Sequence, residues 1–90
     1  MFSGAKKIKA LNLASFNTKN VKNMVSLFYK CTSLSSADFS KFDTSQVTNM
    51  QTMFSNTNFN SLDLTNFDTR NVVNMNSMFQ DNYNLRSFKF

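Results

Sequence analysis

The chain repeats itself with a period of 25–26 residues, and this repeat constrains its fold more than any other feature. The segment Val47–Met50 has counterparts at 21–24 and 72–75. Each repeat reads L-x-x-L-x-L-x-x-F-[DN]-T-x-x-V-x-N-M-x-x-[ML]-F. A unit of this length buries its apolar side chains only by stacking on its neighbours. We therefore expect a single domain over residues 1–90, with about three and a half repeats, as a segment of a longer array.

Each repeat has two parts with different apolar periods. The L-x-L part alternates apolar and polar residues, as in Leu62–Leu64, which predicts a short strand with one buried face. The second part places apolar residues at i, i+3, i+6 and i+7, from Val47 to Phe54. That spacing predicts a helix with one apolar face, capped at its start by Asp43 or Thr44. The pattern therefore predicts an α/β repeat fold with one short parallel strand and one helix per repeat.

The repeat also carries a more specific string. Phe39–Phe54 and Leu62–Met75 follow the pattern L-x-x-L-D-L-S-x-F-D-T-S-N-V-T-N-M-x-x-M-F almost completely. In this string the chain resembles the BspA-type leucine-rich-repeat surface proteins, and in particular their short variant in mycoplasma-type lipoproteins. The resemblance implies a leucine-rich-repeat-like right-handed solenoid on the bacterial cell surface or outside the cell. It implies adhesion to a protein or host-surface ligand, and it supplies no catalytic residues.

The composition argues against catalysis. The chain has no His, one Cys and one Gly, so neither a Ser-His-Asp nor a Cys-His arrangement can be built, and no phosphate-binding glycine loop is present. There is also no Glu. We therefore expect no enzyme activity and no cofactor. Cys31 lacks a partner for an internal disulfide, and we expect it to be a buried structural thiol.

The outward positions of the predicted strands form the candidate interaction surface. Their small polar side chains favour weak or multivalent contact, because tight interfaces usually centre on Trp, Tyr or Arg. Asp38 and Asp63 fall at the same outward position in neighbouring repeats, and we expect stacking to bring them within about 5 Å of each other. Such a pair could hold calcium, but a solvated acidic pair is favoured, and we expect no metal. The candidate surface consists of Lys9, Asn12, Ser35, Ser36, Asp38, Asn60, Ser61, Asp63, Arg86 and Lys89.

Positive charge is concentrated in the first repeat. The net charge is +5, and residues 1–30 contain six lysines and no acidic residue. An alternative function is therefore a binding module that uses this repeat on an anionic partner, either nucleic acid or an acidic surface. Nucleic acid is the less favoured of the two, because the lysines do not line one groove. No apolar run reaches the ~20 residues that span a membrane. Apolar side chains and unpaired strand edges expected at both ends indicate one of two things: the chain is a piece of a longer array, or it associates end to end with other copies.

Overall fold

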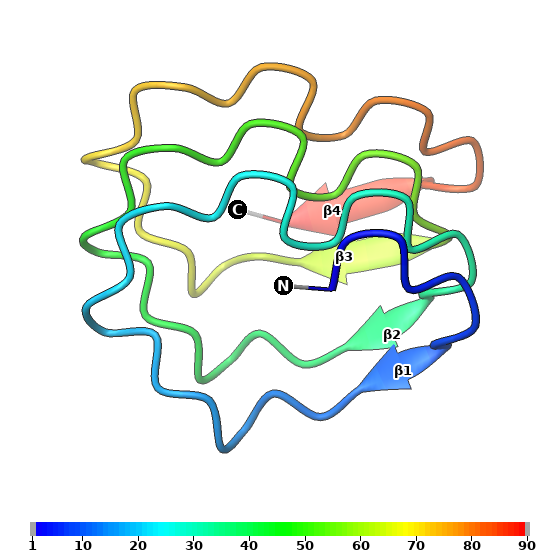
Figure 1. Cartoon of the computed structure of the whole chain (residues 1–90), viewed down its shortest axis with the longest axis horizontal. Helices are drawn as coiled ribbons and strands as arrows, with labels where there is room; N and C mark the ends of the chain where they lie inside the picture. The colour runs from blue at the N-terminus through cyan, green and yellow to red at the C-terminus, as the bar shows by residue number, and fades with distance from the viewer. Residues whose placement is uncertain (1, 90) are drawn as a thin grey trace.

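The computed structural model describes residues 2–89, and in it each repeat forms one layer that stacks on the next (Figure 1). We call residues 8–33, 34–58 and 59–84 layers 1, 2 and 3. Within the described residues each layer contributes one short strand, and a further strand follows layer 3. The strands are β1 (Ala10–Leu11), β2 (Ser36–Ala37), β3 (Ser61–Asp63) and β4 (Ser87–Lys89).

The strands form two parallel pairs. In one pair β1 lies beside β2, with Ala10 opposite Ser36, and in the other β3 lies beside β4, with Ser61 opposite Ser87. Each pairing joins residues that are one repeat apart in the sequence. The repeat period therefore sets the register of both pairs.

The segments predicted to be helical are series of tight turns. In layer 2 the N–H of Met53 donates to the carbonyl of Met50 at 3.2 Å, which closes a turn within the layer. The N–H of Thr52 instead donates to the carbonyl of Asn76 in layer 3, at 3.0 Å. An α-helix directs every such N–H to a carbonyl four residues earlier in the same segment. Residues 2–89 contain no helix.

The predicted α/β leucine-rich-repeat solenoid, with one helix per repeat, is therefore wrong. The molecule is a compact globule with extents of 28 × 27 × 23 Å, not an elongated array of strand–helix units. Its backbone explains the difference, because two positions in the turns of each layer have φ between 54° and 60°, the left-handed region that a right-handed helix excludes. These residues are Ser26, Lys30, Thr52, Asn56, Ser77 and Asp81.

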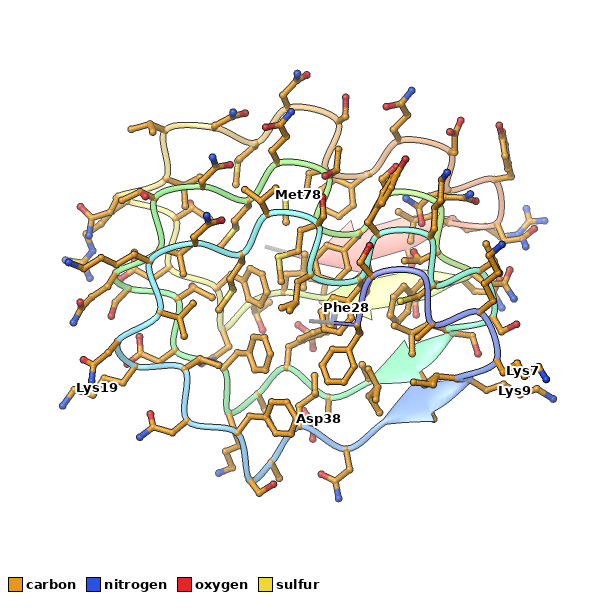
Figure 2. The ribbon with its side chains drawn as sticks, in the orientation of Figure 1. Lys7, Lys9, Lys19, Phe28, Asp38 and Met78 are labelled. Atoms are coloured by element: carbon orange, nitrogen blue, oxygen red, sulfur yellow. The ribbon has the colours of Figure 1, made fainter. Side chains whose placement is uncertain are left out.

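A column of phenylalanine rings runs through the layers. Phe28 stacks on Phe54 with ring centroids 5.5 Å apart, and Phe2 stacks on Phe28 at 5.7 Å. Phe54 in turn lies parallel to Phe79 at 5.8 Å. Offset stacking at this spacing is a favourable arrangement of aromatic rings. Phe28 and Phe54 are fully buried, so this column forms the centre of the core. Phe28 is labelled in Figure 2.

Threonine hydroxyl groups tie the layers together at the positions predicted to be helix caps. The Thr44 hydroxyl donates to the carbonyl of Asp68 at 3.1 Å and accepts from the N–H of the same residue at 2.8 Å. Thr18 makes the same pair of bonds to Asp43, at 3.0 and 2.9 Å. Both threonines are buried. They bond across layers, so the predicted capping role is also wrong.

Candidate binding surface

All ten residues of the predicted interaction surface are exposed. In β3 the side chains of Ser61 and Asp63 are exposed whereas Leu62 between them is buried, as strand alternation requires. The strands thus present one face to solvent, which we call the strand face. Whether this face binds a partner stays a prediction.

Half of the ten residues lie around two hollows on the strand face. The hollows share Ala37 and Asp63, so they lie next to each other along the space between β2 and β3, and we call the two together the groove. Lys9, Asn12, Asn60, Arg86 and Lys89 do not line it. The first hollow is lined by Ser35, Ser36, Ala37, Phe59, Ser61, Leu62 and Asp63. The second is lined by Ala37, Asp38, Phe39, Ser40, Asp63, Thr65 and Asn66.

The groove exists because β2 and β3 are not paired. Each strand is paired on its other side, yet no Cα atom of β2 lies within 8 Å of a Cα atom of β3. The wider space between β2 and β3 is visible in Figure 1. The strand stacking that was predicted to bring Asp38 and Asp63 within about 5 Å does not continue from layer 2 to layer 3.

Two large rings occupy the core beneath the groove. Phe39 and Phe59 are buried, and they stand at positions where the neighbouring layers carry Leu or Ile. Both meet the ring of Phe54 edge to face, with centroids 5.4 and 6.1 Å away. We attribute the separation of β2 and β3 to this extra volume. The signal in the sequence was the change from leucine to phenylalanine at two core positions.

The groove is closed at both ends by bonds between layers 2 and 3. Before the strands, the N–H of Asn58 donates to the carbonyl of Leu34 at 2.9 Å. After them, the side-chain amide of Asn66 donates to the carbonyl of Phe42 at 2.6 Å. The turns on the far side of the molecule stay bonded as well. The layers therefore part only along the strands.

Two carboxylates lie on the rim of the groove. Asp38 accepts a hydrogen bond from the N–H of Ser40 at 2.9 Å, and this bond lowers the pKa of its carboxyl group. Asp63 accepts from the hydroxyl of Thr65 at 2.7 Å and from its N–H at 3.1 Å, which lowers the pKa of Asp63 in the same way. Both carboxylates are ionised at neutral pH. Among residues 2–89 no group of three or more His, Cys, Asp or Glu side chains comes together.

The lysines of the first repeat are exposed but spread apart. Lys7 and Lys9 lie at one corner of the molecule, whereas Lys19 lies at the opposite side (Figure 2). The ammonium group of Lys30 lies 5.3 Å from the centroid of the Tyr29 ring, within the range of a cation–π contact. The described part of the chain has no helix long and apolar enough to cross a membrane.

Comparison with known proteins assigns the chain to a family. No curated protein and no solved structure matches it. The family described as "Mycoplasma protein of unknown function, DUF285" matches residues 1–89, nearly the whole sequence. The chain therefore belongs to the DUF285 family of mycoplasma proteins.

Proposed function

We propose that this chain is a non-enzymatic scaffold of a bacterial surface protein, and that its strand face makes adhesive or protein–protein contacts. The observation that carries the proposal is the groove between β2 and β3, which collects five of the ten predicted surface residues. The likeness of its repeat to the BspA-type surface proteins supports both the surface location and the contact role.

The chemistry of the groove suits a polar protein partner. Its rim offers serine and threonine hydroxyl groups and two carboxylates, and Trp is absent from the chain. Tight interfaces usually place Trp, Tyr or Arg in their centre. A single copy of this surface therefore favours weak binding, which several copies on one cell would strengthen through multivalency.

The test measures adhesion of beads coated with the chain to extracellular-matrix protein and to cultured epithelial cells. We expect beads carrying the native chain to be retained. The double variant Ser36→Arg with Ser61→Arg should lose most of this retention, because two long side chains then fill the strand face. Asn20→Arg, which adds the same group at an exposed position away from this face, is the matched control. Equal loss in the control, or no retention of the native chain, would count against the proposal.

A second candidate function is binding of an anionic partner through the first repeat. It is favoured by the six exposed lysines of residues 1–30, where no acidic residue offsets their charge. Binding to a polyanion column should then weaken steeply as salt rises, because bound counterions are released on complex formation. The triple change Lys6→Gln, Lys7→Gln and Lys9→Gln should shift elution to lower salt. Adhesion that is insensitive to salt and to these changes would favour the strand face instead.

A further inference from the structure

The space between β2 and β3 has the form of a missing strand. β2 is bonded to β1 and β3 is bonded to β4, so the two pairs present their other edges to each other across the groove. Neighbouring strands lie about 4.8 Å apart, so one strand placed between two others needs those two about 9.6 Å apart. No Cα atom of β2 lies within 8 Å of a Cα atom of β3, so these two strands are farther apart than paired neighbours.

The main chain on both sides of the groove is available for pairing. Directly after β3, the N–H of Leu64 donates to the carbonyl of Lys89 in β4, so this side of the main chain faces β4. Alternate residues of a strand point their N–H and C=O groups in opposite directions, so those of Ser61 and Asp63 face β2. The N–H of Ser36 donates toward β1, so that of Ala37 faces β3. Edges of this kind are templates for an added strand.

The side chains around the groove indicate what sequence would fit. On the solvent side, the carboxylates of Asp38 and Asp63 border the groove, and they favour Lys or Arg on an inserted segment. On the core side, Ala37 and the buried Leu62 border it, and they favour small apolar residues. A strand alternates its side chains between two faces, so the suitable segment alternates basic and small apolar residues.

We propose that a short extended segment of a partner protein, with Lys or Arg alternating with small apolar residues, inserts between β2 and β3 and joins the two strand pairs into one sheet. The bonds from Asn58 to Leu34 and from Asn66 to Phe42 close the groove at both ends, so about four residues of the segment lie between the strands. This inference rests on the proposed function, because it names the kind of partner that the strand face contacts. Main-chain hydrogen bonds supply the affinity, and the two carboxylates select a basic sequence.

The probe is a peptide of about four residues, alternating lysine and alanine, with capped ends, because a longer extended peptide would not fit between the bonds that close the groove. Its control is the same peptide with N-methyl groups on every second residue, so that the N–H groups on one side of the peptide strand are blocked. The control keeps the charge but loses the donors to one strand, so it should bind about tenfold more weakly. Hydrogen exchange of the folded chain should slow at the amides of Ala37, Ser61 and Asp63 when the unmodified peptide binds. Equal binding of the two peptides would show charge attraction alone and overturn strand insertion.

Variants of the chain separate charge from main-chain pairing. Asp38→Asn with Asp63→Asn should weaken binding roughly threefold or more by removing both carboxylates. The matched control is Asp81→Asn, an exposed position outside the groove whose left-handed backbone suits Asn. Ser61→Pro removes a donor that faces the groove. It should weaken peptide binding by removing one main-chain bond to β3, and its melting temperature shows whether the fold is intact.

The outcomes distinguish this inference from the proposed function. Absence of peptide binding, while bead adhesion still depends on the strand face, would overturn strand insertion and leave the contact role in place. Peptide binding with protection of the three amides, but without bead adhesion, would support strand insertion and remove the adhesive role. An Asp81→Asn variant that loses as much binding as the double variant would show that the peptide does not sit in the groove, and would overturn the inference.

Discussion

Single side chains in β3 have opposite surroundings, and this contrast predicts opposite effects of substitution. Leu62 is 3% exposed and packs in the core, whereas Ser61 beside it faces solvent. Leu62→Ala should lower the free energy of unfolding by about 2–5 kcal/mol, since it removes buried methyl groups and leaves a cavity. Ser61→Ala should change it little. Urea unfolding of both variants is the measurement, and similar losses would show that the two side chains are wrongly assigned to their faces.

Cys31 is a buried thiol, and its reactivity should reflect that. It is 1% exposed, and its sulfur donates to the carbonyl of Phe2 at 3.0 Å. Burial raises the pKa of the Cys31 thiol, because desolvation disfavours the thiolate, the form that reacts. A thiol reagent should therefore label the folded chain far more slowly than the chain in denaturant. Equal labelling rates would contradict the burial.

The same raised pKa predicts a loss of stability in alkali. The pKa of Cys31 is higher in the folded chain than in the unfolded chain, so the unfolded chain loses its proton first as pH rises. The contribution of the Cys31 thiol to stability is complete below the pKa that this thiol has in the unfolded chain. It is lost as pH rises from that value through the higher pKa of the folded chain. Thermal unfolding of Cys31→Ala should depend less on pH in this range than that of the native chain. Ala5 occupies the same position of an earlier repeat, so alanine fits there.

At the scale of the elements, the threonine ties offer a direct test of how the layers are held together. Thr44 is buried, and its hydroxyl is bonded to both main-chain groups of Asp68. Thr44→Val keeps the shape but leaves those groups without a partner, which should cost about 1–3 kcal/mol. Thr44→Ser keeps the hydroxyl and should cost less. Calorimetry compares the two, and a smaller loss for valine than for serine would mean that the bonds do not hold the layers.

The sequence predicted these elements only in part, and particular residues show why. The L-x-L alternation identified the outward positions of the strands, because strand side chains must point to two faces. The spacing of Val47, Met50 and Met53 suggested a helix, but turns closed between residues three apart bring the same residues to one side. The weak helix propensity of Thr48, Asn49 and Thr52 between them was the overlooked signal. The groove depended on the volumes of Phe39 and Phe59, which a repeat pattern does not encode.

At the scale of the whole molecule, apolar surface remains exposed on the first and third layers. On layer 1 an apolar groove is lined mainly by Phe16, Val21 and Leu27, together with Phe2 from the segment before that layer. On layer 3, Val73 is 88% exposed, and Met75 and Tyr83 are exposed as well. Exposed apolar patches of this kind favour association, so we predict that the chain self-associates through its outer layers.

Sedimentation across a concentration series tests this self-association. The apparent mass should rise with concentration, and Val73→Lys should reduce the rise by placing a charge in the contact. Asn71→Lys, an exposed change of the same charge on the same layer, serves as the control. A constant monomer mass at every concentration would contradict the prediction.

The hydrogen bonds between layers also have a genetic consequence. On the turn side, the N–H of Met24 donates to Asn49, and the N–H of Met50 donates in the same way to Asn74. Each layer therefore donates to the next layer from the same position of the repeat, and the next layer accepts at the same position of its own repeat. Recombination between two such gene segments would delete or duplicate one whole unit and still join matching surfaces. The number of units in chains of this kind can therefore change over generations while the contact between neighbouring units stays the same.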